Sequence, residues 1–270
     1  MSSGDDWRET FRPDIPSPAR MYNYFLGGKD HFEVDRKAAE QVIATIPDVL
    51  VFARENRAFL RRAVRYLVTE CGIRQIIDIG TGLPSEGNVH EVAHEYEPDV
   101  HVVYVDHDPV VLAHGRNMLN GVPGTTIIER DLLKPAAILA DEELLGLIDF
   151  TEPVAVLLVA VVHFIDDDAH PEDLIGQLVA SLAPGSYVVL SHATSDSRPQ
   201  EARAVERIYR ATTTNIHART RSQVLAMLGD GVELVEPGLV WAPQWRPEPG
   251  GVPGGDPAAS NVYAVVARKP

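Results

Sequence analysis

The chain has 270 residues, of which 45% are hydrophobic, and it carries a formal net charge of −15 at pH 7. This charge opposes binding to nucleic acids and to anionic membranes, because both attract clusters of Lys and Arg. A single cysteine, Cys71, excludes an intrachain disulfide and a cysteine-rich metal site, so the composition predicts one α/β domain with additions, no metal, and a reducing cytoplasm.

The first 54 residues are predicted to precede the main domain. Residues 1–15 are polar and interrupted by proline, and we expect a tail that lies on the surface or is disordered. Residues 16–54 are predicted to form a helical lid. One helix is expected from Pro18 to the Gly27-Gly28 stop, and a second over residues 35–46.

The main domain, residues 55–270, is predicted to begin with a helix over residues 55–70 and a buried strand at 75–79. Asp78 places a carboxylate at the end of this strand, where open α/β sheets bind ligands. Gly80 and Gly82 follow it. They lack a Cβ and tolerate positive φ, so a ligand can approach the main-chain N–H groups of the turn.

A second acidic residue follows about one βαβ unit downstream. A capping box at Asn88 and Glu91 predicts the intervening helix. The next strand, residues 101–105, ends at Asp106, at the spacing where a carboxylate can take the hydroxyls of a ribose. Together with the glycine turn, Asp106 predicts a nucleoside pocket.

The residues after the glycines indicate whether the ligand is a dinucleotide or a nucleoside without phosphate. A dinucleotide-binding GxGxxG would need glycine where the chain has Ser85, and residues 83–87 intervene before the helix with the acidic Glu86. These features disfavour a pyrophosphate, which needs a helix N-terminus directly after the glycines. S-adenosylmethionine has no phosphate and carries a sulfonium cation, so it suits an acidic turn better.

Strands and helices continue to alternate along the rest of the chain. The last two strands have no helix between them, so they are predicted to pair antiparallel. We predict an α/β fold with a Rossmann-like sheet of seven strands and helices on both faces. The remaining strands are expected at residues 126–129, 154–162, 187–190, 232–235 and 262–266, and the remaining helices at 109–119, 132–147, 171–182, 199–212 and 220–228.

These motifs resemble those of class I S-adenosylmethionine-dependent methyltransferases, whose first two motifs are similar to Asp78-x-Gly80-x-Gly82 and Asp106. More narrowly, the runs at 27–32, 78–92, 103–109 and 163–165 resemble an actinobacterial methyltransferase-like family long described as a domain of unknown function. The resemblance covers residues 16–245. It implies S-adenosylmethionine as cofactor and a small-molecule acceptor, and it identifies no substrate.

The resemblance also implies roles for particular residues. Asp131 would face the adenine amine, or it could instead be the N-cap of the following helix. In the lid, Arg20 or Lys29 would meet the methionine carboxylate, unless Lys29 and Asp30 form only a solvated ion pair. The implied cofactor residues are Asp78, Gly80, Thr81, Gly82, Asp106, His107, Asp131, Leu132, Ala160, Arg20 and Lys29, and the residues expected to face the substrate are Tyr22, Tyr24, Asp30 and His31.

His163 is the best candidate for a catalytic base, because the end of the fourth strand borders the transferred methyl in this fold class and imidazole titrates near neutral pH. The alternative is a histidine that only hydrogen-bonds the backbone at the strand end. Asp166-Asp167-Asp168 and His170 have metal-ligand chemistry by residue type, but consecutive residues of one loop diverge, so we expect a solvated loop.

The predicted function is methyl transfer to a small molecule. A cofactor-binding regulator without catalysis is the alternative, and a nicotinamide oxidoreductase is a more distant one. A homo-oligomer is left open.

Overall fold

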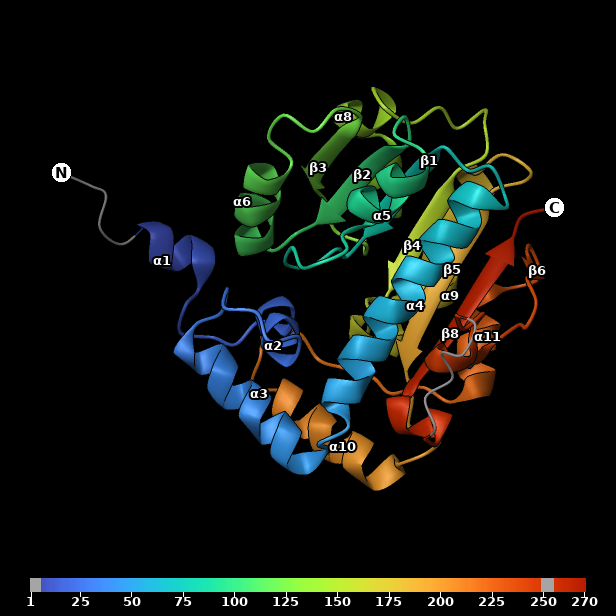
Figure 1. Cartoon of the computed structure of the whole chain (residues 1–270). Helices are drawn as coiled ribbons and strands as arrows, with labels where there is room; N and C mark the ends of the chain where they lie inside the picture. The colour runs from blue at the N-terminus through green and yellow to red at the C-terminus, as the bar shows by residue number, and fades with distance from the viewer. Residues whose placement is uncertain (1–5, 249–254) are drawn as a thin grey trace.

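The computed structural model describes residues 6–248 and 255–270, with a mixed sheet at its centre (Figure 1). The strand order is β3-β2-β1-β4-β5-β8-β6, and β7 also pairs with β8. The strands are β1 (Gln75–Ile79), β2 (His101–Asp106), β3 (Thr125–Glu129), β4 (Ala155–Val159), β5 (Tyr187–Ala193), β6 (Glu233–Leu234), β7 (Val240–Trp241) and β8 (Val262–Arg268).

The sheet confirms the predicted fold class. Strands β3, β2, β1, β4 and β5 are parallel, while β8 runs antiparallel to β5. Both β6 and β7 pair with β8. β6 lies opposite Ala267 and Arg268, and β7 lies opposite Tyr263 and Ala264. They are therefore two parts of one interrupted edge strand. Because the parallel strands end at one edge, the residues that follow β1, β2 and β4 come together there.

Helices cover both faces of the sheet, as predicted. On one face, α4 (Val49–Thr69), α5 (Val89–Tyr96) and α6 (Pro109–Met118) pack against alternate strand residues such as Ile76. On the other, α7 (Pro135–Leu139), α8 (Glu142–Leu145), α9 (Pro171–Ser181) and α11 (Arg221–Leu228) pack against residues such as Ile77. The two faces alternate because successive strand side chains point in opposite directions.

A third hydrophobic cluster lies outside the sheet and forms the lid. It joins α2 (Pro18–Phe25), α3 (Glu33–Thr45) and the start of α4 to α10 (Pro199–Tyr209), and these helices lie together in Figure 1. Met21, Ala39 and Val42 are fully buried in this cluster, and Tyr209 joins it from α10. The lid is therefore built from two regions that are distant in sequence, of which only residues 16–54 were predicted. The predicted boundary at residue 54 falls inside α4.

Several predicted boundaries are wrong. Residues 6–11 of the predicted tail form helix α1 (Asp6–Phe11), and carbonyls from Phe11 to Ile15 bind the Arg20 guanidinium; residues 1–5 lie outside the described residues. The strand predicted at 154–162 stops at Val159, because Ala160 has a φ of 56° and a 3-10 turn, η1 (Val162–Phe164), follows.

The helix predicted over residues 132–147 is two short helices. Lys134 and Pro135 delay its start, and Asp141 accepts hydrogen bonds from the amides of Glu143 and Leu144 as the N-cap of α8. Among the described residues, no helix combines the length and apolar character that crossing a membrane requires.

Candidate functional site

A cavity of about 540 Å³ opens at the carboxyl edge of the parallel strands, beneath the lid. The residues that follow β1, β2, β3 and β4 line one part of it, and α2, α3, α4, α10 and the segment after α10 line much of the rest. Its volume is within the range of roughly 300–1,000 Å³ that is common for small-molecule sites.

Glycine is needed at two positions of the turn after β1, Gly80 and Gly82, for different structural reasons. Both adopt positive φ, 73° at Gly80 and 68° at Gly82. A Cβ added at Gly80 would overlap the side chain of Val161, whereas one added at Gly82 would meet no atom within 4 Å. Gly80 therefore allows close packing, and Gly82 leaves one side of the turn open beside the cavity.

Asp106 lies against this turn and is held by main-chain amides. Its Oδ2 accepts a hydrogen bond from the Gly82 amide at 2.9 Å, and its Oδ1 accepts from the amides of His107 and Asp108 at 2.8 and 2.9 Å. A carboxylate offers about four lone-pair sites, so three amide donors leave capacity for one donor from a ligand. Burial raises the pKa of Asp106, while these amides act in the opposite direction.

Asp78 lines the same cavity as Asp106 and is 6% exposed. Burial raises its pKa to about 6, and the nearby charge of Asp106 acts in the same direction. A hydrogen bond from Thr81 and the charge of Arg57 oppose the shift. The two acidic strand ends therefore converge on one cavity.

Arg57 brings a cation to this part of the cavity from α4. Its Nη2 donates to the main-chain oxygens of Glu86 and Gly87 at 3.2 and 2.9 Å. Its Nε is buried and has no hydrogen-bond partner within the described residues. A buried donor without a partner costs about 1–3 kcal/mol, more when charged, so this guanidinium is suited to an anionic ligand group.

Residues 7–270 match the family described as S-adenosyl methyltransferase. The chain belongs to this family. It is 38% identical to a DUF574 family protein from Streptomyces avermitilis, with a TM-score of 0.92 and coverage of 96% of this chain and 100% of that one. It is 39% identical to a candidate methyltransferase from Thermobifida fusca, with a TM-score of 0.88 and coverage of 94% and 95%. No curated protein matches the sequence.

More distant structures share the S-adenosyl methyltransferase fold alone. Human N-acetylserotonin methyltransferase in complex with SAM is 15% identical, with a TM-score of 0.51 and coverage of 97% of this chain and 64% of that chain. At this identity, the likeness supports the class I methyltransferase architecture of the sheet.

In this member of the S-adenosyl methyltransferase family, most of the cofactor residues predicted from strand ends line the cavity. Asp131 accepts a hydrogen bond from the Leu133 amide at 2.9 Å, but α7 begins only at Pro135, so Asp131 is not its N-cap. The lining residues from the predicted set are Asp78, Gly80, Thr81, Gly82, Asp106, His107, Asp131, Leu132 and Ala160.

The basic lid residues lie elsewhere. Arg20 is 2% exposed, and its Nε donates to Asp35 at 2.8 Å, so it stabilises the lid and does not line the cavity. Lys29 and Asp30 are exposed and also lie outside the lining. Neither Arg20 nor Lys29 therefore lines the cavity, whereas Arg57 lines it near the turn, and the contact of Arg20 or Lys29 with a methionine carboxylate stays a prediction.

The aromatic lid residues divide in the same way. Tyr22 lines the cavity, and its hydroxyl donates to the Ala53 oxygen at 3.1 Å and accepts from Asn56 at 2.9 Å. Tyr24 and His31 pack ring against ring, with centroids 5.0 Å apart, outside the cavity lining. The structure therefore does not bring Tyr24, Asp30 or His31 to the site.

His163 lines the cavity and is 2% exposed. Its Nδ1 accepts a hydrogen bond from the Ala193 amide at 3.4 Å. Burial, and then the charges of His192 and Arg219, hold the pKa of His163 well below its usual range. The ring is therefore neutral at pH 7, and Nε2 carries its proton, which makes it a weaker base than the sequence suggested.

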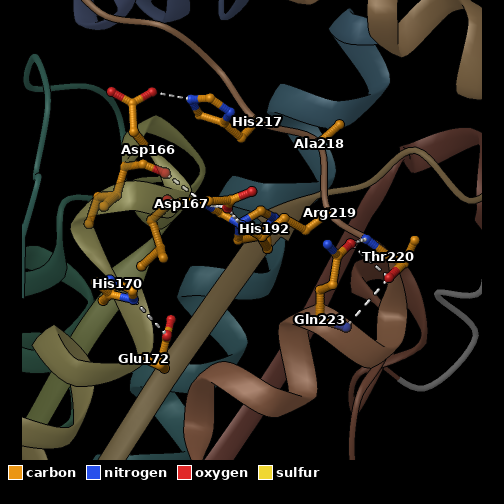
Figure 2. Close-up of polar contacts among 12 residues, drawn as sticks. Asp166, Asp167, His170, Glu172, His192, His217, Ala218, Arg219, Thr220 and Gln223 are labelled. Atoms are coloured by element: carbon orange, nitrogen blue, oxygen red, sulfur yellow. Dashed lines mark hydrogen bonds and ion pairs between the residues drawn. The ribbon is translucent and has the colours of Figure 1, made fainter.

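Figure 2 shows the polar contacts of Arg219 with His192 and with the acidic loop that follows β4. Arg219 is 4% exposed, donates to the oxygens of Val162 and Ile165, and lies 3.1 Å from Nε2 of His192. It also binds Asp167 at 2.6 Å.

Asp166, the residue before Asp167, pairs with a different side chain. Asp166 pairs with His217 at 2.6 Å, and the His217 amide donates to the His163 oxygen at 2.7 Å (Figure 2). The acidic loop therefore fixes backbone geometry beside the cavity, and no group of three or more metal-ligating side chains occurs within the described residues.

The sequence reasoning missed Asn56, Arg57 and Arg219, and it predicted α10 as a helix but not as part of the cavity. A signal existed for Asn56, because it lies three and four residues before the apolar Phe59 and Leu60 and so on the buried stripe of its helix. A polar residue on such a stripe has a hydrogen-bonding role. No local pattern marks α10 as part of the cavity, since its position depends on packing against α3.

Proposed function

We propose that this protein transfers a methyl group from S-adenosylmethionine to a small-molecule acceptor bound beneath the lid. The observation that carries the proposal is the pairing of an open Gly82 turn with an amide-anchored Asp106 in one cavity. Membership of the S-adenosyl methyltransferase family supports it.

The residues present fit this cofactor. Asp106 has capacity left for a ribose hydroxyl, and Asp131 and Leu132 border the same part of the cavity for the adenine. The buried Nε of Arg57 suits the methionine carboxylate. Asp78 is mostly ionised at pH 7, with a pKa of about 6, and so it suits the positive charges of the methionine end.

When bound, the cofactor would supply an electrophilic sulfonium methyl group. The acceptor atom would attack the methyl carbon in line, the S–CH₃ bond would break to release S-adenosylhomocysteine, and the acceptor would lose its proton to water. The protein's own residues position the acceptor and exclude water. The lid cluster closes the cavity on the side away from the sheet. Neutral His163 offers an N–H donor to the acceptor.

A buried chain of hydrogen bonds fixes the cavity between lid and sheet. Tyr22 accepts from Asn56 at 2.9 Å, Asn56 accepts from the Ser191 hydroxyl at 2.5 Å, and that hydroxyl accepts from the Ala160 amide at 2.9 Å. The chain holds Ala160 in its left-handed conformation at the end of β4 and ties α2 to that position. Such satisfied buried networks favour one geometry, which in-line transfer requires.

Calorimetry with S-adenosylhomocysteine tests the cofactor site. We expect the wild-type protein to bind it, Asp106→Ala to bind at least about tenfold more weakly, and Asp230→Ala, which removes an exposed carboxylate, to bind like the wild type. Equal affinity in Asp106→Ala and the wild type would show that the pocket is misassigned.

A cofactor-binding regulator without catalysis is the second candidate, and the low pKa of buried His163 favours it, because a strong base is missing at that position. Incubation with methyl-labelled cofactor and a small-molecule extract distinguishes the two. Labelled product supports the enzyme, whereas tight binding without labelled product supports the regulator.

A further inference from the structure

The cavity has a second part, the lid end, which is bordered by α2, α3, α10 and the start of α4. Much of this end is lined by apolar side chains that belong to the lid cluster or pack against it. They are Phe25, Val42, Ile46, Val49, Val205 and Ile216. A ligand that fills this end removes apolar surface from water, which is worth about 25 cal/mol per Å².

Four rings that line the cavity are in continuous contact. The Phe52 and His163 centroids are 6.2 Å apart, those of His163 and Phe164 are 4.4 Å apart, and those of Phe164 and Tyr209 are 6.0 Å apart. This aromatic wall spans from the end of β4 to α10. Aromatic ligands gain from offset or edge-on contacts with such rings beyond the area that they bury.

The ionised side chains that border the lid end already have partners in the protein. Arg198 pairs with Asp48 at 2.5 Å, Asp166 pairs with His217 at 2.6 Å, and Glu206 accepts from the Ala218 amide at 3.2 Å. An anionic acceptor would lose its hydration here without gaining a cation of its own, because Arg198 is already paired with Asp48. The lid end therefore favours an uncharged molecule.

Two polar groups of the aromatic wall remain available to orient such a molecule. The Tyr209 side chain is 5% exposed and lines the cavity, and its hydroxyl makes no hydrogen bond within the described residues. The other is Nε2 of His163, because the Ala193 amide occupies Nδ1. Hydrogen-bonding groups on an otherwise apolar wall fix orientation and specificity in small-molecule sites.

We propose that the lid end binds the methyl acceptor as an uncharged aromatic molecule with a hydroxyl group, which the Tyr209 hydroxyl or the His163 N–H contacts. This assignment rests on the methyltransferase function proposed above and names the acceptor class for that same site.

The test is calorimetric titration of the protein saturated with S-adenosylhomocysteine, with 2-naphthol as the probe. We expect 2-naphthol to bind, and 2-naphthalenesulfonate, which has the same rings and a fixed negative charge, to bind at least about tenfold more weakly. Naphthalene, which lacks the hydroxyl, is expected to bind several-fold more weakly than 2-naphthol, because the polar contacts are lost.

Two pairs of proteins locate the binding. Val205→Asp places a carboxylate in the lid end and should weaken 2-naphthol binding at least about tenfold, whereas Gln200→Asp adds the same charge to an exposed position of the same helix and should leave it unchanged. Tyr209→Phe keeps the ring and removes only the hydroxyl. If the Tyr209 hydroxyl contacts the ligand, Tyr209→Phe should bind 2-naphthol about as weakly as naphthalene. If the His163 N–H contacts the ligand, His163→Phe should show the same loss.

The outcomes separate the two proposals. If S-adenosylhomocysteine binds but 2-naphthol does not, or the sulfonate binds as tightly, the acceptor class is wrong and the cofactor site stands. Equal weakening by Val205→Asp and Gln200→Asp would also overturn the acceptor class. If S-adenosylhomocysteine fails to bind the wild-type protein, the proposed function falls and the acceptor assignment with it.

Discussion

The Ser17 hydroxyl donates a hydrogen bond to Oδ2 of Asp108 at 2.7 Å, and it thereby joins the first residue before α2 to the residue that caps α6. Ser17 is 2% exposed, and its amide donates to Asp35, which also binds Arg20. The lid is therefore attached beside Asp106, at the nucleoside part of the cavity. We therefore expect that loss of these contacts affects binding in that part of the cavity.

Ser17→Ala should loosen this attachment without unfolding the sheet. We expect a loss of about 0.5–1.5 kcal/mol, because one part-buried hydrogen bond is removed. Hydrogen exchange should become faster in α2 and stay unchanged in β1, and S-adenosylhomocysteine should bind several-fold more weakly. Unchanged exchange in α2 would show that this contact does not hold the lid.

Arg57→Gln should weaken the binding of a ligand that carries a carboxylate and leave the binding of a ligand without one unchanged. The variant should bind S-adenosylhomocysteine about tenfold or more weakly, because a charge-assisted hydrogen bond is lost. It should bind 5′-methylthioadenosine, which has no carboxylate, like the wild type. Arg54→Gln, at an exposed position of the same helix, is the matched control. An equal loss for both ligands would assign Arg57 a structural role instead.

The strand-end part of the candidate site could be predicted to come together because its determinants are local. Gly80 and Gly82 follow a recognisable strand, and Asp106 ends the next one, so parallel pairing alone brings them to one edge. Asp131 and Ala160, which the family resemblance implied, likewise follow strand ends and line the cavity. Capping signals at Asn88 and Asp108 also located helix starts to within a residue.

The lid half could not be predicted because long-range packing determines it. Arg20 and Lys29 were plausible cations on sequence, but Asp35, at a separation of 15 residues, draws Arg20 into a buried pair. Arg57 lies within the helix predicted over residues 55–70, but no local pattern indicates that its position on α4 borders the cavity. The aromatic wall includes Tyr209 from α10. The packing of α10 against α3 cannot be predicted from the sequence of either helix alone.

Arg219→Met should be strongly destabilising. It leaves the oxygens of Val162 and Ile165 without their donor and frees Asp167, so we expect a loss of about 2–4 kcal/mol in urea unfolding. Arg210→Met, at an exposed position, should change stability by less than about 0.5 kcal/mol. A small effect at Arg219 would mean that the ends of β4 and β5 are held without it.

Asp78 should make the protein less stable as the pH rises from about 4 to 7. Its folded pKa of about 6 lies above the ordinary carboxyl value, so the folded state holds a proton that the unfolded state has already released. The stability contribution is complete below the unfolded pKa and is lost as the pH rises through the folded pKa, to a limit of about 3 kcal/mol. Asp106 adds to this trend, because burial raises its pKa too.

Asp78→Asn should remove Asp78's part of this pH dependence. In urea unfolding, the variant should be more stable than the wild type at pH 7.5. The difference in free energy of unfolding between the two proteins should be about 1–3 kcal/mol larger at pH 7.5 than at pH 4.5. The same variant should bind S-adenosylhomocysteine more weakly at pH 7.5, because the carboxylate that destabilises the free protein is the one placed for the ligand's positive charge. A gain in stability that is equal at both pH values would show that Asp78 is ionised across this range and that its burial carries no such cost.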